Sequence, residues 1–319
     1  MTPDVVHVET TLRRKRLAGD LILLLVAVVW GSTFVIQRIA AQEGGLLVFN
    51  GARFLVGALT IAPFAVHSFL SKPAARIPEG MAAAGFHFRT AAGVGLAGLL
   101  LMSGSGFQQV GMQYTTAGNA GFITGLYVVV IPLLLSIVGR QPARPIILLA
   151  AFMAAGGLFM LSTGGSIRVN HGDGLVLVGT VFWALHVILV GWIVKRIEVT
   201  KFAVGQFLVC GLASFALGLI FEPQGLQSVS GLWLLVVYTG VLTIGMGFTL
   251  QAVGQRTALP ADAAIILSME TVFAALSGWI FLQEYLLPVQ LAGCGIMLLG
   301  MLTAQSDVLF RKRGFSIID

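Results

Sequence analysis

Charged residues are scarce in this sequence, and their scarcity excludes most classes of soluble protein. Only 10% of the 319 residues are charged, whereas soluble domains carry roughly 25%. Cysteine is almost absent, since Cys210 and Cys294 lie apart in apolar runs and form neither a CxxC pair nor a metal-ligand spacing. A Walker A motif, an H-E-x-x-H pair and a G-x-S-x-G elbow are also missing. We therefore expect no cofactor, no metal and no enzymatic activity.

Long apolar runs make up most of the chain. Hydrophobic types account for 57% of the residues, the mean hydropathy is +0.95, and 40 residues are glycine, which is frequent in membrane helices. A helix that crosses a bilayer needs about 20 apolar residues. Ten segments reach that length, which predicts an all-α integral membrane protein with ten transmembrane helices. They are 18–41, 45–71, 88–112, 117–139, 144–163, 172–194, 201–221, 229–252, 259–282 and 286–305.

Positive charges predict the orientation, because Lys and Arg gather in cytoplasmic loops. Ten spans with the N-terminus inside place 16 of the 19 Lys and Arg residues in the cytoplasm and Arg168 outside. Arg38 and Arg53 fall near outer helix ends close to Glu43, where we expect a structural ion pair. The pattern predicts an inner-membrane protein with both termini cytoplasmic. Its positive charge is explained by this orientation and by contact with the lipid bilayer, so we expect no nucleic-acid partner. The 16 residues are Arg13, Arg14, Lys15, Arg16, Lys72, Arg76, Arg89, Arg140, Arg144, Lys195, Arg196, Lys201, Arg256, Arg311, Lys312 and Arg313.

The sequence also contains an internal repeat. Trp30 recurs as Trp183 at an offset of 153, later helices recur at an offset of 143, and SGSGF at 103–107 resembles IGMGF at 244–248. Each unit holds five spans, an odd number, so the second unit enters the membrane upside down. Inverted repeats around a central cavity are typical of secondary transporters. The predicted units are a cytoplasmic tail at 1–17, repeats at 18–164 and 165–306, and a cytoplasmic tail at 307–319.

Two tryptophans are placed where a substrate cavity would lie. Trp30 and Trp183 each follow about 12 residues of their span, about 18 Å deep at about 1.5 Å per residue, whereas most membrane tryptophans sit at the interfaces. Thr33, Phe34 and Gln37 share the helical face of Trp30. We expect these residues to line a cavity with an aromatic wall and a few polar groups. The alternative is that the large rings only fill the core of the bundle.

Further polar groups lie near the middle of other spans. Glu270 is about 12 residues into its span, where a charged side chain costs roughly 2.5–3.5 kcal/mol, so it is a candidate functional residue. Its repeat partner is Tyr127, and Asn119 lies eight residues before Tyr127 on the same helical face. His186 follows Trp183 by one helical turn and is a candidate substrate ligand or proton carrier, with a satisfied core histidine as the alternative.

Two segments carry a family resemblance. WGSTFVIQ at 30–37 and SMETVFAALSGWIFLQE at 268–284, within ten spans in two halves, resemble the EamA-type permeases of the drug/metabolite transporter superfamily. Glu270 stands where that family usually has Glu-Pro, with Thr271 in place of the proline, and Glu284 matches a closing glutamate. The resemblance implies a basket of helices around a central cavity, with the fifth and tenth spans outside. It also implies export of small metabolites by alternating access.

These observations favour a secondary transporter that exports amino acids, aromatic or other neutral ones, or similar small metabolites. The first alternative is a permease for drugs or nucleotide sugars, although carriers of anionic sugars should show several cations in mid-span, and none is expected here. A membrane enzyme or a flippase is a further alternative. The sequence leaves open whether the small-molecule transporter is a monomer or a homodimer and whether protons drive it.

Overall fold

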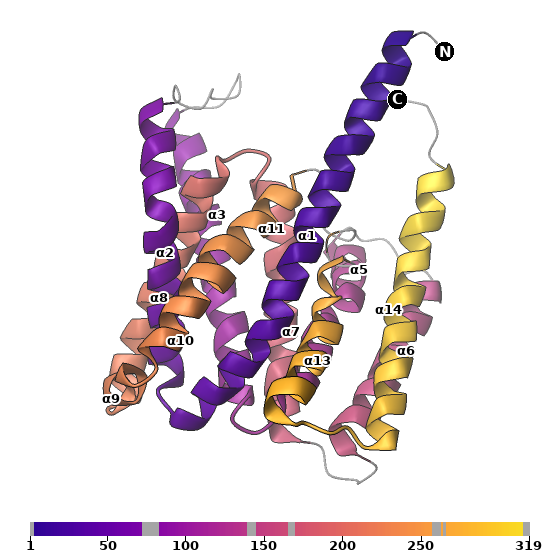
Figure 1. Ribbon diagram of the computed structural model, residues 1–319. Helices are drawn as coiled ribbons and strands as arrows, with labels where there is room; N and C mark the ends of the chain where they lie inside the picture. Colours follow the sequence, from indigo (N-terminus) through magenta and orange to yellow (C-terminus); the bar gives the residue numbers. More distant parts are fainter. Residues whose placement is uncertain are drawn as a thin grey trace.

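Helices account for nearly all of the chain that the computed structural model describes, which is residues 3–71, 83–138, 145–164, 170–256, 263 and 266–314 (Figure 1). Within these ranges there is no β-strand. The first-half helices are α1 (Pro3–Glu43), α2 (Leu46–Ser71), α3 (Ala83–Gly111), α4 (Ala117–Gly125), α5 (Tyr127–Val138) and α6 (Pro145–Thr163). The second-half helices are α7 (His171–Ile193), α8 (Val199–Phe221), α9 (Gly225–Ser230), α10 (Trp233–Tyr238), the π-helical η1 (Thr239–Phe248), α11 (Thr249–Gly254), α13 (Glu270–Leu282) and α14 (Pro288–Gly314).

Seven helical stretches in the described ranges are long and apolar enough to cross a membrane, and three shorter apolar helices accompany them. The chain is therefore an all-helical membrane protein, as the sequence predicts. Helix α1 begins at Pro3, so the part of the expected tail 1–17 that the structure describes is helical. The N-terminal end of α1 and the C-terminal end of α14 lie at the same end of the bundle (Figure 1).

Side-chain caps and glycines set several helix boundaries. Thr116 accepts a hydrogen bond from the backbone N–H of Asn119 and starts α4, and Asn170 accepts one from Gly172 and starts α7. Gly44 and Gly45, at φ of 85° and 62°, form the turn between α1 and α2 in a conformation that costs other residues more. These local signals place the short connections at the two ends of the bundle.

Helix packing repeats at the offsets found in the sequence. A Cβ added at Gly111 on α3 would lie 2.8 Å from the carbonyl oxygen of Gly172 on α7. A Cβ added at Gly254 on α11 would lie 3.1 Å from the carbonyl oxygen of Gly19 on α1. Gly254 follows Gly111 by 143 residues, and Gly172 follows Gly19 by 153 residues. The same close backbone approach therefore occurs twice, each time between a helix of one half and a helix of the other, and only glycine leaves room for it.

The pair formed by α6 and α14 shows the same relationship at one edge of the bundle (Figure 1). A Cβ at Gly157 on α6 would lie 2.6 Å from the carbonyl oxygen of Gly293 on α14. A Cβ at Gly300 on α14 would lie 3.0 Å from the carbonyl oxygen of Ala150 on α6. Adding 143 to Gly157 and Ala150 gives Gly300 and Gly293, so the two contacts are exchanged by the repeat.

One detail of the predicted repeat is wrong. Aligning SGSGF at 103–107 with IGMGF at 244–248 gives an offset of 141, but the contacts relate these helices at 143. Gly104 packs against the ring of Trp183 and Gly247 packs against the ring of Trp30, which makes Gly104 and Gly247 the equivalent pair. Short glycine-rich motifs match at several registers, whereas close backbone packing allows only one.

Two predicted spans are interrupted at equivalent places. The span expected at 117–139 breaks between α4 and α5, where the N–H of Leu126 donates to the carbonyl of Ile123 at 3.1 Å. The span expected at 259–282 breaks before α13, where the N–H of Met269 donates to the carbonyl of Ile266 at 3.2 Å. The break at Met269 forms without a proline, since the next positions are Glu270 and Thr271. The span expected at 229–252 is also irregular, because it divides into α10, η1 and α11.

Two carboxylates of the second half bind helix N-termini of the first half. Glu284 accepts the backbone N–H groups of Ala117 and Gly118 at 2.9 and 3.0 Å, at the start of α4. Glu222 accepts the backbone N–H groups of Leu47 and Val48, at the start of α2. The first N–H groups of a helix have no partner within the helix and carry partial positive charge. Each carboxylate therefore joins the two halves at the end of the bundle opposite the N-terminus of α1.

Candidate functional site

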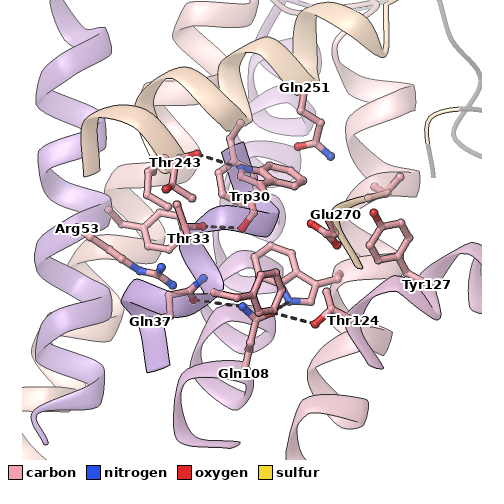
Figure 2. A pocket seen from close by; sticks show the side chains of 16 residues that line it. Trp30, Thr33, Gln37, Arg53, Gln108, Thr124, Tyr127, Thr243, Gln251 and Glu270 are labelled. Carbon is pink, nitrogen blue, oxygen red and sulfur yellow. Dashed lines mark hydrogen bonds between the residues drawn. The ribbon is translucent and has the colours of Figure 1, made fainter. Parts of the chain in front are cut away.

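A cavity of about 50 Å³ lies in the middle of the bundle, between helices of both halves (Figure 2). A buried water needs roughly 10–15 Å³ by the same measure, so this volume corresponds to a few water molecules. The site is therefore compact in this conformation, and a larger solute requires the helices to separate. The lining residues are Trp30, Thr33, Phe34, Gln37, Arg53, Phe54, Gln108, Thr124, Tyr127, Trp183, Val187, Thr243, Ile244, Phe248, Gln251 and Glu270.

Aromatic rings form one wall of the cavity, with Phe248 at their centre. Phe248 lies 4.6 Å from Trp30, 5.8 Å from Trp183 in a stacked arrangement, and 6.0 Å from Phe54, measured between ring centroids. Trp30 and Trp183 come from equivalent places in the two halves, and Phe248 on η1 joins them. Such ring pairs hold one another in place and leave the cavity a rigid apolar side.

Glutamine and threonine side chains form a polar wall on one side of the cavity. Gln108 on α3 accepts hydrogen bonds from Trp183 Nε1 at 3.0 Å and from Thr124 Oγ1 at 3.3 Å. Its amide nitrogen donates to Gln37 Oε1 at 3.2 Å (Figure 2). The network connects α1, α3, α4 and α7, so the polar groups on this side of the cavity are largely occupied by one another.

Other polar groups that line the cavity lie outside this network, and among them the Tyr127 hydroxyl interacts with the Glu270 carboxyl. Both side-chain polar atoms of Gln251 and the Thr243 hydroxyl are buried without a hydrogen bond. Figure 2 shows the Tyr127 and Glu270 side chains facing each other, with Gln251 on the adjoining helix. Buried polar groups are nearly always satisfied, and each that is not requires an explanation such as a ligand. Gln251 is the repeat equivalent of Gln108, so the two halves differ here.

Arg53 corrects two predictions from the sequence. It does not form the expected ion pair with Glu43, because its Nε and Nη2 atoms donate to Asn50 Oδ1 at 3.1 and 2.8 Å. It lies in the cavity wall with only 2% of its surface exposed, so the cavity contains a cation where none was expected. Arg38, the other cation of the expected cluster, donates to the backbone carbonyl of Met112. The contacts of both arginines were therefore predicted wrongly. Position along a span can be counted from the sequence, but the direction in which a side chain points around its helix cannot.

The residues singled out from the sequence mostly converge on this cavity. Seven of the nine line it, namely Trp30, Thr33, Phe34, Gln37, Tyr127, Trp183 and Glu270. The other two lie outside its wall. His186 is fully buried with Nε2 2.9 Å from Gln206 Oε1, and its ring lies edge-on to Trp183 and Phe248. Asn119 is buried in α4, where its backbone N–H donates to Thr116.

Sequence reasoning missed several lining residues. Gln108 and Gln251 carried a usable signal, because each follows a glycine that packs on a cavity tryptophan by four residues and the pair is related by the 143-residue offset. Phe248 belongs to the IGMGF motif but one phenylalanine among 21 is not distinctive. Arg53 was noticed but assigned to a helix end.

A second, larger hollow of about 290 Å³ lies at the periphery, beside α4, α13 and the start of α14. Its walls include Trp279, Tyr285 and Leu291, whose side chains are more than half exposed. The carboxylate of Glu284 on this wall is occupied by the N-terminus of α4. Exposed apolar side chains of a membrane helix suit a surface that faces lipid, so the central cavity is the better candidate for a solute site.

Comparisons with known proteins agree with this architecture. The model of the EamA-like transporter family matches residues 17–163 and again residues 170–304. A protein of Archaeoglobus fulgidus named "Uncharacterized transporter" is 31% identical over 288 residues, which cover 90% of this chain and 86% of that protein. The "Uncharacterized transporter YyaM" of Bacillus subtilis is 24% identical over 219 residues, covering 64% of this chain and 69% of that protein.

A solved structure described as "Crystal structure of protein" has the same fold. Its TM-score is 0.63 at 16% sequence identity, and the similarity covers 94% of this chain and 99% of that one. The family match covers both halves of the chain, each half contributes helices to the central cavity, and the resemblance seen in the two motifs is confirmed. The protein is a multi-pass membrane transporter, and the chain belongs to the EamA-like transporter family.

Proposed function

We propose that this transporter exports amino acids, aromatic or other neutral ones, or similar small metabolites across the inner membrane by alternating access. The observation that carries the proposal is the central cavity, in which an aromatic wall stands beside buried polar groups without partners. An amino acid places charged groups and an apolar side chain within a few ångströms of each other. The cavity offers a matching surface for each part.

The proposed architecture is ten transmembrane helices in two inverted repeats, spanning 18–164 and 165–306. Three observations support it: the family model matches twice, the close helix contacts recur at offsets of 143 and 153, and seven long plus three shorter apolar helices are present in the described ranges. Broken helices at the cavity are common in secondary transporters, and this chain has an equivalent pair of breaks, before Tyr127 in the first half and before Glu270 in the second.

Alternating access follows from this arrangement in physical terms. The cavity is too small for an amino acid as it stands, so the two halves must move apart on one side and then on the other. Glu222 and Glu284 hold the halves together at the end that the charge bias places outside, with both termini and tails 1–17 and 307–319 in the cytoplasm. The described structure then corresponds to a state closed toward the outside.

We assign the lining residues different tasks. Trp30, Trp183 and Phe34 contact the apolar part of the solute, with stacking or contact to an ammonium group worth about 0.5–2 kcal/mol. Thr33, Gln37, Tyr127 and Glu270 contact its polar groups. Asn119 and His186 lie outside the wall, and we assign them support of α4 and of the Trp183 ring respectively.

The direct test is transport by the purified protein in liposomes. Radiolabelled phenylalanine, leucine and glycine would be offered with and without imposed proton and voltage gradients, and empty liposomes serve as the control. We expect saturable transport of at least the larger neutral amino acids. Saturable transport of a drug or a nucleotide sugar together with none of any amino acid would replace the substrate assignment and leave the family unchanged.

The topology has its own test. In a variant whose two buried cysteines are replaced by alanine, single cysteines at Gln42 and Gln227 should react with an impermeant thiol reagent on intact cells. A cysteine at Ser71 should react only after the membrane is permeabilised. Reaction of the Ser71 cysteine on intact cells would contradict the ten-span orientation.

A further inference from the structure

The guanidinium of Arg53 is a buried cation in the wall of the central cavity. Arg53 lies seven residues after Leu46, where α2 begins, which places it about 10 Å along the helix at about 1.5 Å per residue. Only 2% of its surface is exposed. A charged side chain inside a membrane protein is costly and usually has a named partner or a function. The partner of Arg53 therefore needs to be identified.

Protein groups hold the guanidinium in place without neutralising it. Asn50 Oδ1 accepts hydrogen bonds from Nε and Nη2, and the Asn50 amide nitrogen donates to Ser105 on α3 and to Ser214 on α8 at 2.9 and 3.0 Å. The guanidinium carbon lies 5.6 Å from the rings of Phe49 and Phe54. These partners are uncharged, and no ion pair of Arg53 occurs among the described residues. The Nη1 group makes no hydrogen bond to any residue that the structure describes.

The opposite side of the cavity carries a second set of polar groups. Figure 2 shows Arg53 on one side and Glu270 on the other, with the aromatic rings between them. Gln251 and Tyr127 lie beside Glu270. The Tyr127 hydroxyl interacts with the Glu270 carboxyl, and both side-chain polar atoms of Gln251 are buried without hydrogen bonds. The cavity is thus polarised, with a fixed cation at one end and a carboxyl group with hydrogen-bonding neighbours at the other.

We propose that Arg53 binds the carboxylate of the transported solute, which assigns the substrate class as small molecules with one carboxylate and a hydrogen-bond-donating or cationic group at the other end. This inference rests on the proposed transport through the central cavity and adds the orientation of the solute. Arginine presents a planar set of N–H donors that matches a carboxylate, and the bond to Asn50 fixes that plane. A zwitterionic amino acid would place its ammonium group toward Glu270.

Binding of four related compounds to the purified protein tests the proposal. The probes are L-phenylalanine, L-phenylalaninamide, which lacks the carboxylate charge, phenethylamine, which lacks the carboxyl group, and 3-phenylpropionate, which lacks the amine. Affinity is measured from the fluorescence of the cavity tryptophans and from the ligand-dependent shift in melting temperature. We expect the wild type to bind phenylalanine about tenfold or more tighter than its amide, since hydrogen bonds between charged groups are strong.

Three variants separate the role of the cation from folding. Arg53→Gln should weaken binding of phenylalanine and 3-phenylpropionate about tenfold or more and leave the amide nearly unchanged. Asn50→Asp keeps the arginine but gives it an internal carboxylate, so it should cause the same selective loss even where Arg53→Gln does not fold. Arg38→Gln removes a cation outside the cavity wall and should leave the ratio of acid to amide unchanged.

The outcomes distinguish this inference from the proposed function. In one outcome the protein transports amino acids, but Arg53→Gln and Asn50→Asp leave the ratio of its affinities for phenylalanine and phenylalaninamide unchanged. That result would overturn the carboxylate site and leave amino-acid export standing. Binding of 3-phenylpropionate that depends on Arg53, without binding or transport of any amino acid, would support the carboxylate site and overturn amino-acid export. Absence of binding for every carboxylate probe to folded wild-type protein would overturn both.

Discussion

Glu284 provides the sharpest prediction, because its carboxylate makes a defined contact between the two halves. It accepts the backbone N–H groups of Ala117 and Gly118 at 2.9 and 3.0 Å and lies at the positive end of α4. In the proposed orientation and transport cycle, opening of the outer side requires α4 and the end of α13 to separate, and this contact opposes that movement. The substitution Glu284→Gln removes the charge and keeps one acceptor oxygen with nearly the same shape.

The size of the effect follows from the hydrogen bonds that change. Bonds to a charged group are worth about 1.5–3 kcal/mol each and neutral ones about 0.5–1.5 kcal/mol. Glutamine retains one neutral bond and loses the other. Glu284 is half-buried, so solvent screens part of the difference, and we expect a loss of about 1–2 kcal/mol. At 1.4 kcal/mol per factor of ten, the closed state loses about 5- to 30-fold in population relative to the outward-open state.

The assay combines a thermal melt with cysteine accessibility. A cysteine is placed at Thr33 in the cavity wall, in a background where Cys210 and Cys294 are alanine, and its reaction with an impermeant thiol reagent is timed from outside. Glu284→Gln should speed that reaction about 5- to 30-fold and lower the melting temperature in detergent. Glu43→Gln removes an exposed carboxylate and should change neither quantity.

Two results would show that the contact between Glu284 and the N-terminus of α4 does not hold the outer side closed. If Glu284→Gln and Glu43→Gln label and melt like the wild type, the two hydrogen bonds do not hold the outer side closed. If Glu284→Gln lowers the melting temperature without changing the labelling rate, the carboxylate only caps α4.

Three further substitutions test the site. Trp30→Ala and Trp183→Ala should each weaken transport of phenylalanine more than that of glycine, by up to about 30-fold; equal loss for both solutes with a lower melting temperature would mean that the rings only fill the core. Gly247→Ala puts a Cβ 2.6 Å from Trp30 Nε1, whereas the Cβ of Gly104→Ala lies 3.1 Å from the Trp183 ring. Overpacking costs about 1–3 kcal/mol, so Gly247→Ala should lower the melting temperature more than Gly104→Ala. The reverse order would contradict the packing described. Glu270→Gln should lower transport per folded molecule while the melting temperature stays nearly equal, since the neutral amide has almost the same shape and can still bond to the Tyr127 hydroxyl; normal transport would remove Glu270 from the site.

The sequence predicted correctly that the two tryptophans line one cavity. Trp30 and Trp183 repeat at one offset and at one depth, and both line the cavity together with Glu270 and Tyr127. His186 was selected by the same reasoning about depth, but the structure places it outside the wall and against Gln206. Depth is a property of position along a span and can be counted from the sequence. The direction in which a side chain points depends on how its helix is turned against its neighbours.

Arg53 and Gln251 show why part of the site could not be predicted. The position of Arg53 seven residues into α2 suggested a helix end, and only the packing of α2 against α8 and η1 turns it inward. Gln108 and Gln251 are equivalent in sequence, but Gln108 bonds to three side chains and Gln251 to none within the described residues. Repeat symmetry predicts which residues correspond and says nothing about which of the two keeps its partners.

The sequence by itself determined that the chain is an all-helical membrane protein with an internal repeat. Hydropathy and charge act locally along the chain and are nearly independent of how helices meet, so composition and period were sufficient. The tertiary structure alone decided the breaks before Tyr127 and Glu270, the cation in the cavity wall and the unpartnered groups opposite it. Those features depend on contacts between helices far apart in the sequence, where glycines such as Gly111 and Gly254 set the distance and rotation of each helix against the next.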